Sequence, residues 1–289
     1  MELGVHLPLM RFGDEPLSLQ RLEATVDAAR DCGFAAVSAN DHLVFQTPWL
    51  DGLTALAAVI ERSGDLELAT TVALVVLRGP VQLAKALAAI DVLSRGRVIA
   101  GVGPGSSARD YELAGLPFEE RWKRFDEALD RLRELLTGDE LEPRPARPIP
   151  LWVGSWGSRA GLARVARAAD GWLASAYNTT PERFAAGRAA LADGFPTALA
   201  TMWTWITEDR AEADRVLRDV LAPFLRRDPD ELGSQVCVGS ADHCAELLAR
   251  YAEAGCGRVY MWPLGDEPHQ LERIATAWDR ARQGRSIIE

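Results

Sequence analysis

A repeated alternation of helical and extended patterns is the feature that most constrains the fold of this chain. One repeat begins with an apolar helical pattern from Ala84 to Leu93 and turns at Ser94 to Gly96. A short apolar strand, Val98 to Val102, follows and runs into a segment of alternating glycines up to Gly105. Helices that alternate with short strands pack on a parallel sheet. This segment is therefore predicted to be one unit of a β/α structure.

Eight apolar runs with strand character can be identified along the chain. They are Glu2 to Pro8, Phe34 to Ala39, Leu66 to Leu74, Val98 to Val102, Pro150 to Gly154, Gly171 to Ser175, Ala198 to Ile206 and Arg258 to Trp262. Eight parallel units indicate closure into a (β/α)8 TIM barrel of the α/β class, which typically needs about 250 residues. The 289 residues are therefore expected to form one domain over 1–289.

An open, doubly wound sheet is the main alternative to the barrel. The run Gly101-x-Gly103-x-Gly105 would then be a dinucleotide-binding turn, but it follows the fourth strand and not the first. Pro104 also has no N–H group to offer a phosphate. The barrel is the better interpretation.

Composition excludes several classes of function. A net charge of −10 argues against binding to nucleic acid or to an anionic membrane surface. No apolar run reaches the roughly 18 residues that a membrane span needs, and the first residues lack an export signal. The four cysteines are widely spaced, which fits a reduced cytoplasm. Cys237, His243 and Cys244 match no zinc spacing, so no metal site is expected.

Barrel enzymes carry their active sites at the carboxyl ends of the strands. This rule nominates His6 after the first strand, Asp41 and His42 after the second, and Gly103 after the fourth. An imidazole at a strand end can exchange protons near neutral pH, and the alternative is a loop histidine bonded to a backbone carbonyl. Asp41 is expected either to orient the His42 ring or to cap the following turn.

The fifth strand runs into Gly154-Ser155-Trp156-Gly157-Ser158 and then a helix. Glycines allow close backbone approach, and a helix N-terminus favours anions, so this loop is a candidate phosphate site. A plain turn with Ser158 as helix cap is the alternative. Tryptophans near strand ends could line a pocket for a planar cofactor or an apolar substrate. Trp203 and Trp205 share one face of their strand, and the sequence leaves open whether they and Trp262 line a pocket or the core.

Several segments resemble, in the same order, the bacterial luciferase-like monooxygenase superfamily and its coenzyme F420-dependent oxidoreductase branch. The similar segments are AIDVLSRGRVIAGVGPG (89–105), SANDHL (38–43), PIPLWVGSWGSRAGLARVARAADGWLAS (148–175) and VGSADHCAELLARYAEAGCGRVYMWPLGD (238–266). The resemblance covers nearly the whole chain. It implies a barrel that binds F420 or FMN at its mouth.

Further expectations for individual residues follow from the resemblance alone. The family's non-prolyl cis peptide under the flavin ring would fall at Thr71-Val72, which the residues by themselves present as a plain core strand. His42 matches the position used beside the redox carbon. The implied phosphate-binding residues are Gly154, Ser155, Trp156, Gly157, Ala174 and Ser175. A glutamate found in some F420-dependent sugar-phosphate dehydrogenases is replaced here by Ser106, which counts against that substrate class.

Three functional hypotheses remain at this point. The first is an F420-dependent oxidoreductase that transfers a hydride between the deazaflavin and a small organic substrate, with His42 as proton donor or acceptor. The second is an FMN-dependent two-component monooxygenase that uses O2 and reduced FMN from a flavin reductase partner. The third is a ligand-binding barrel without turnover. A Schiff-base enzyme is excluded because Lys85 and Lys123 both fall in predicted helices, and a homodimer is implied only by the resemblance.

Overall fold

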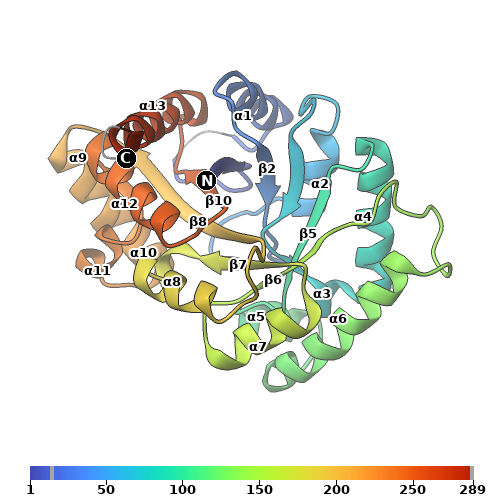
Figure 1. Cartoon of the computed structure of the whole chain (residues 1–289). Coiled ribbons are helices and arrows are strands. Elements are labelled where there is room, and N and C mark those ends of the chain that lie inside the picture. Colours follow the sequence, from blue (N-terminus) through green and yellow to red (C-terminus); the bar gives the residue numbers. More distant parts are fainter. Residues whose placement is uncertain (14–15, 287–289) are drawn as a thin grey trace.

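The computed structural model describes residues 1–13 and 16–286, and these form a closed parallel barrel surrounded by helices (Figure 1). The strands are β1 (Glu2–His6), β2 (Ala36–Ala39), β3 (Glu67–Thr70), β4 (Ala73–Leu74), β5 (Val98–Gly103), β6 (Leu151–Gly154), β7 (Gly171–Ser175), β8 (Thr197–Ile206), β9 (Cys237–Gly239) and β10 (Arg258–Pro263). Parallel pairs run from β1 through β2, β3, β5, β6 and β7 to β8, and β10 pairs with both β8 and β1. The predicted eight-stranded barrel is confirmed for the described residues.

Small residues allow the barrel interior to close. Alternate strand positions point inward and form one packed cluster: Ala36, Ala69, Ile99, Trp152, Leu173, Ala198, Ala200 and Tyr260. A Cβ at Gly4 would lie 2.6 Å from the Tyr260 ring, and one at Gly101 would lie 2.1 Å from the Thr70 carbonyl oxygen. The two glycines are therefore required where a large ring or a neighbouring strand passes close by.

Helices cover the outside of the barrel. They are α1 (Leu19–Asp31), α2 (Gly52–Ala58), α3 (Val75–Arg78), α4 (Pro80–Ser94), α5 (Ala108–Leu113), α6 (Arg121–Thr137), α7 (Arg159–Ala168), α8 (Pro181–Ala189), α9 (Arg210–Arg215), α10 (Ala222–Leu225), α11 (Pro229–Gly233), α12 (Ala241–Glu253) and α13 (Glu267–Ser286). The short helices η1 (Phe118–Glu120) and η2 (Ala176–Asn178) and the π-helical turn η3 (Val216–Leu221) complete the set.

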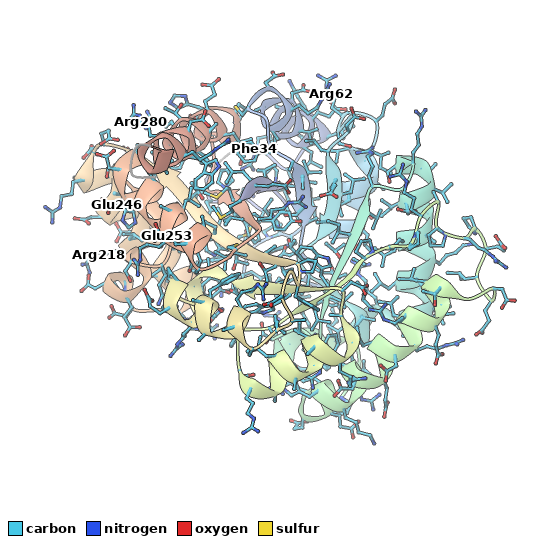
Figure 2. The ribbon with its side chains drawn as sticks, in the orientation of Figure 1. Phe34, Arg62, Arg218, Glu246, Glu253 and Arg280 are labelled. Carbon is cyan, nitrogen blue, oxygen red and sulfur yellow. The ribbon has the colours of Figure 1, made fainter. Side chains whose placement is uncertain are left out.

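Apolar spacing explains how the outer helices attach. In α6 the buried residues include Phe125, Leu129, Leu132 and Leu136, which lie on one face of the helix. Trp122 belongs to the same pattern but is exposed, and α6 starts at Arg121, after a separate short helix that holds Phe118. Charged side chains such as Arg62, Arg218, Glu246 and Arg280 project outward from the helical layer (Figure 2).

The structure corrects the predicted third strand. The run expected from Leu66 to Leu74 is divided into β3 and β4, and the peptide bond between Thr71 and Val72 is cis. The conformational expectation from the family resemblance is therefore confirmed at this bond. The interpretation of Thr71 and Val72 as plain core strand is wrong, because the chain leaves the strand ladder here and resumes it at Ala73.

An insertion after β8 was not predicted. Residues 207–236 contain α9, η3, α10 and α11, and the short strand β9 follows them. β9 pairs with the last residues of β8, whereas β7 pairs with its first residues. The β8 register shifts near Thr201, a non-glycine residue with φ 58°. After this irregularity Trp203 joins a second apolar cluster with Leu221, Leu232 and Trp262. The insertion thus packs on the carboxyl end of the barrel.

Candidate active site

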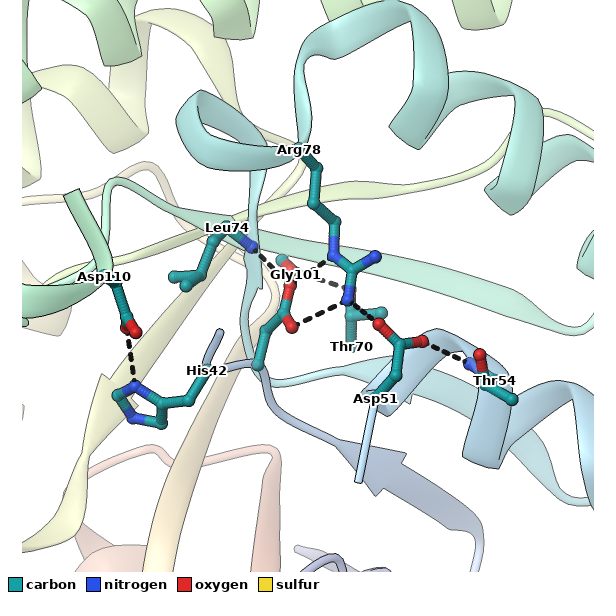
Figure 3. A network of polar contacts seen from close by, with 9 residues as sticks. His42, Asp51, Thr54, Thr70, Leu74, Arg78, Gly101 and Asp110 are labelled. Carbon is teal, nitrogen blue, oxygen red and sulfur yellow. Dashed lines mark hydrogen bonds and ion pairs between the residues drawn. The ribbon is translucent and has the colours of Figure 1, made fainter. Parts of the chain in front are cut away.

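His42, in the loop after β2, and Asp110, in the first turn of α5, come together at the mouth of the barrel (Figure 3). Nδ1 of His42 lies 2.9 Å from Oδ2 of Asp110, and the backbone N–H of Val44 donates to Oδ1 of Asp110 at 2.8 Å. Ser107 caps α5 by accepting from the Asp110 N–H. A carboxylate only accepts hydrogen bonds, so Nδ1 of His42 carries the proton and Nε2 is left for a reactant.

Asp41 has a different partner from the one considered in the sequence. Its carboxylate accepts from Nε of Arg78 at 2.5 Å, from Nη2 of Arg78 at 2.8 Å and from the N–H of Leu74 at 3.2 Å. Arg78 also pairs with Asp51, and its bonds to Asp41 raise the pKa of Arg78 above its usual value. The interpretation of Asp41 as the orienting partner of His42 is therefore wrong. Asp41 fixes the loop after β2 to the segment after the cis peptide.

His6 is a buried structural residue. Its side chain is 1 % exposed, with Nδ1 donating to the Leu7 carbonyl at 2.7 Å and Nε2 accepting from the Asn40 N–H at 3.0 Å. Burial lowers the pKa of His6 from 6.5 to about 3, so the ring is neutral. Both ring nitrogens are used by the backbone. His6 thus holds Asn40 in place, and a role of His6 in the cofactor site stays a prediction.

An aromatic cluster surrounds His42 and extends across the mouth. Its members are His6, Phe12, His42, Phe45, Trp49, Trp203, Phe224 and Trp262. The His42 ring lies 4.7 Å from Phe45 and 4.8 Å from Trp49, between ring centroids. Trp203 stacks on Trp262 at 4.0 Å. Both of these tryptophans are almost fully buried, whereas Trp205 is half-buried and packs against the second apolar cluster.

The cis peptide forms part of one surface with two glycines. A Cβ at Gly103 would lie 2.8 Å from Cγ2 of Val72, and one at Gly154 would lie 3.1 Å from Cγ1 of Val72. Nearby, Asn40 Oδ1 and Thr71 Oγ1 are buried and have no hydrogen-bond partner among the described residues. A buried polar atom without a partner costs about 1–3 kcal/mol. These atoms, together with the bare glycine backbone, fit a flat polar ring system placed against Val72.

The loop after β6 is organised by two serines. Ser155 Oγ accepts from the Gly157 N–H at 3.3 Å, and Ser158 caps α7 by accepting from the Gly161 N–H at 3.1 Å. The alternative of a capped turn is therefore correct as a description of the loop. Gly157 has φ 83°, and Trp156 is largely exposed. The loop presents the N-terminus of α7 to the mouth, so a role in phosphate binding stays a prediction.

The two expected phosphate-binding residues on β7 differ in their surroundings. Ala174 is 1 % exposed and belongs to the core between barrel and helices, so its side chain cannot contact a ligand. Ser175 lies at the strand end, where its hydroxyl is 2.9 Å from Oγ1 of Thr201 and accepts from Nδ2 of Asn178 at 3.0 Å. Of the pair, only the Ser175 side chain is near the mouth.

A family model for luciferase-like monooxygenases matches residues 1–226. The chain belongs to the luciferase-like monooxygenase family. An uncharacterised protein from Mycobacterium tuberculosis is 30 % identical over 243 residues, which are 76 % of this chain and 79 % of the relative. The F420-dependent glucose-6-phosphate dehydrogenase of Gordonia bronchialis is 33 % identical over 174 residues, covering 50 % of each chain.

Solved structures with the same fold include enzymes that use different cofactors. A monooxygenase from Streptomyces bottropensis has a TM-score of 0.82 at 19 % identity and covers 98 % of this chain and 100 % of its own. An F420-dependent secondary alcohol dehydrogenase has a TM-score of 0.79 at 17 % identity, with coverage of 96 % and 97 %. An FMN complex of a Pseudomonas putida Baeyer–Villiger monooxygenase has a TM-score of 0.69 at 18 % identity, with coverage of 95 % and 96 %. At these identities the likeness establishes the fold.

Asp110 is the residue of the candidate site that the sequence did not single out, although it contacts His42. It lies in the first turn of α5, and nothing in its neighbourhood separates it from an ordinary helix-start residue. The one available signal is its place in the segment that follows β5, at the same end of the barrel as His42. Within the described residues no group of three potential metal ligands occurs, and no helix has the length and hydropathy to cross a membrane.

Proposed function

We propose that this member of the luciferase-like family is a coenzyme F420-dependent oxidoreductase that acts on a small organic substrate. The observation that carries the proposal is the His42–Asp110 pair, which fixes the protonated Nδ1 and leaves Nε2 without a hydrogen-bond partner among the described residues. The F420-dependent enzymes named among the relatives, which match half of the chain at 30–33 % identity, support the choice of cofactor.

Different residues are proposed to bind the cofactor and to transfer a proton. The deazaflavin, when bound, supplies hydride chemistry. Val72, Gly103 and Gly154 would support its ring, and the loop from Gly154 to Gly157 with Ser175 would hold its phosphate. His42 would then give or take a proton at Nε2 as the substrate is reduced or oxidised.

The substrate is proposed to be small and apolar or planar. Phe45, Trp49 and Phe224 pack around the His42 side of the mouth and leave it poor in charge apart from the paired Asp110. Ser106 stands where a sugar-phosphate dehydrogenase of this family has a glutamate. Alcohols, enones and imines are therefore the classes to screen, and a sugar phosphate is not expected.

An FMN-dependent monooxygenase is the second candidate. The aromatic enclosure favours it, because excluding water protects reactive oxygen chemistry. This activity would depend on a flavin reductase as partner, just as the first would depend on a source of reduced or oxidised F420. We place either activity in the cytoplasm, where such reductases and cofactors are found.

A cofactor titration separates the two candidates. Purified protein would be titrated with F420 and FMN, each oxidised and reduced, and binding followed by quenching of tryptophan fluorescence. Tight F420 binding with weak FMN binding is the expected result. A His42→Ala variant should bind F420 as well as the wild type does but lose turnover by about 100-fold. Preference for reduced FMN together with O2 consumption would replace the proposal with the monooxygenase, and full turnover by His42→Ala would remove His42 from the reaction.

A further inference from the structure

Three tryptophans near the carboxyl end of the barrel have indole N–H groups that are buried but donate to nothing. Nε1 of Trp49, Trp203 and Trp205 has no hydrogen-bond partner within the part of the chain that the structure describes. An indole N–H can only donate, and a buried one usually has an acceptor. Trp172, which is also fully buried, follows this rule and donates to the Ser155 carbonyl at 2.9 Å. The donors near the mouth are therefore unused.

Trp203 is the one of the three whose N–H group has no route to water. It lies within β8 and is 2 % exposed. Its ring stacks on Trp262 at a centroid distance of 4.0 Å, and Phe224 meets it edge-on at 5.6 Å. Trp49 and Trp205 are half-buried, so a small movement lets water reach their N–H groups. A strand residue fixed by stacking has no such freedom, and only a bound acceptor can satisfy Trp203.

Trp203 and His42 lie at different ends of the aromatic cluster. The His42 ring is 4.7 Å from Phe45, Phe45 is 5.2 Å from Phe224, and Phe224 is 5.6 Å from Trp203, between ring centroids. Two apolar rings thus separate the two polar groups along this path. A single ligand that contacts both groups must have an apolar body between its own two polar ends.

The two polar groups have opposite hydrogen-bonding character. Nδ1 of His42 holds the proton shared with Asp110, so Nε2 is an acceptor and receives an O–H or N–H group. Nε1 of Trp203 is a donor and requires an oxygen with a free lone pair.

The surroundings of Trp203 show that this oxygen is neutral. The rings that contact Trp203 are the apolar rings of Phe12, Phe224 and Trp262. A carboxylate placed among them would be buried without a cation, which is strongly unfavourable, whereas a carbonyl oxygen carries no net charge.

We propose that Trp203 is a specificity-determining residue that binds a carbonyl oxygen of the substrate, away from the group that reacts at His42. The substrate class is then a planar, largely apolar molecule with an alcohol or amine at one end and a separate ketone at the other. This inference rests on the proposed function, in which His42 faces the reacting group, and it narrows the substrate of that function. Phe224, half-buried on the short helix α10, is the ring that such a ligand displaces on entry.

A ketone and the matching hydrocarbon test the role of Trp203. The probes are 1-tetralone and tetralin, which share two fused rings and differ by the carbonyl oxygen. Each is titrated into protein labelled with 15N-tryptophan, without added cofactor, while NMR follows the indole N–H signals of the nine tryptophans. The variant Trp203→Phe identifies the Trp203 signal by its loss. 1-Tetralone should move this signal downfield and should bind the wild type about fivefold more tightly than tetralin does.

Two tryptophan variants separate the hydrogen bond from ring packing. Trp203→Phe keeps an aromatic ring but lacks the donor, so it should bind the two probes with equal affinity. Trp122→Phe removes an indole from the exposed surface of α6 and should keep the full preference for the ketone. A ketone preference that persists in Trp203→Phe, or a ketone-induced shift confined to signals other than that of Trp203, would overturn the assignment.

Failure of this inference can be told apart from failure of the proposed function. The two probes are bound without cofactor, so equal affinity of the wild type for 1-tetralone and tetralin overturns the assignment of Trp203 alone. Absence of F420 binding in the cofactor titration overturns the proposed function, whatever the two probes show.

Discussion

Nδ1 of His42 lies 2.9 Å from Oδ2 of Asp110, across 68 positions of the sequence. Asp110 is 1 % exposed and its other oxygen accepts from the Val44 N–H, so both oxygens face donors. This arrangement sets the tautomer of His42 and the direction in which Nε2 points. The proposed proton transfer by His42 therefore depends on Asp110, a residue that lies far from the end of β2 in the sequence.

The variant Asp110→Asn should invert the His42 tautomer. An amide has one acceptor oxygen, and if the Val44 N–H retains it, the NH2 group faces Nδ1 and forces that nitrogen to accept. Nε2 then carries the proton. We expect turnover to fall by about 100-fold or more with little change in cofactor affinity. The ring 15N chemical shifts of His42 report the tautomer directly and do not require a known substrate.

Asp41→Asn is the matched control for this experiment. Asp41 is next to His42 in sequence but bonds to Arg78 and Leu74. This variant should lose stability yet keep the proton of His42 on Nδ1. A tautomer that changes in Asp41→Asn, or that stays unchanged in Asp110→Asn, contradicts the assignment of Asp110 as the positioning residue.

Removing Arg78 should destabilise the fold. The Asp41 side chain is 3 % exposed, so Arg78→Ala leaves a buried carboxylate without its cation. Breaking a buried pair in this way typically costs about 3–5 kcal/mol. Urea unfolding measures the loss, and Arg250→Ala, which breaks an exposed pair with Glu182, should lower the stability far less. Similar losses of unfolding free energy in the two variants would show that the buried Asp41–Arg78 pair stabilises the fold no more than an exposed pair does.

Gly103→Ala should disturb the surface formed by Val72. The added Cβ would lie 2.8 Å from Cγ2 of Val72, a distance so short that neighbouring atoms would have to shift. We expect a loss of about 1–3 kcal/mol in stability and weaker binding of the cofactor. At Gly13 an added Cβ meets nothing within 4 Å, so Gly13→Ala serves as the control. Unchanged cofactor affinity in a folded Gly103→Ala protein would argue against a ring placed on Val72.

His6 should make stability fall at mildly acidic pH. Its pKa is depressed from 6.5 to about 3 by burial, so below pH 6.5 the unfolded chain takes up a proton that the folded chain does not. The stabilisation is therefore complete above pH 6.5 and decreases as the pH falls toward 3, by at most about 1.4 kcal/mol per pH unit. His6→Gln lacks this titration. The difference in unfolding free energy between the two proteins should shrink from pH 7 to pH 5, and a constant difference would contradict the prediction.

The sequence was sufficient for the barrel because its strands and helices alternate with distinct periods. The runs at Gly171 to Ser175 and Arg258 to Trp262 lie on β7 and β10 within one residue. The break at Thr71-Val72 was not visible in the pattern, since both residues are typical of strands, and it came only from the family resemblance. Backbone isomers depend on tertiary packing, which apolar periodicity does not record.

The candidate site was predicted in part. His42 was found because it ends a strand, and the glycines were found because they end two others. Asp110 was missed because Ser107-x-x-Asp110 has the form of a helix start. In such a pattern the residues at the start of the helix form hydrogen bonds with one another, so the sequence gives no reason to expect a distant partner. Asp41 was misassigned for the opposite reason: adjacency in sequence suggested a contact, whereas its side chain turns toward Arg78. Pairings between loops depend on how the barrel closes.

The insertion between β8 and β9 contributes to both ends of the barrel mouth. Phe224 packs against Phe45 in the aromatic cluster. Two residues later Arg226 adopts φ 54°, and the side chain of Arg227 donates a hydrogen bond to Asn178 in the turn after β7. A single segment thus contacts both the aromatic cluster around His42 and the turn after β7. Grafting residues 207–236 from a relative would alter both sets of contacts in one step while the eight barrel strands stay as they are. A change confined to this segment thus reaches two parts of the mouth without repacking the barrel interior.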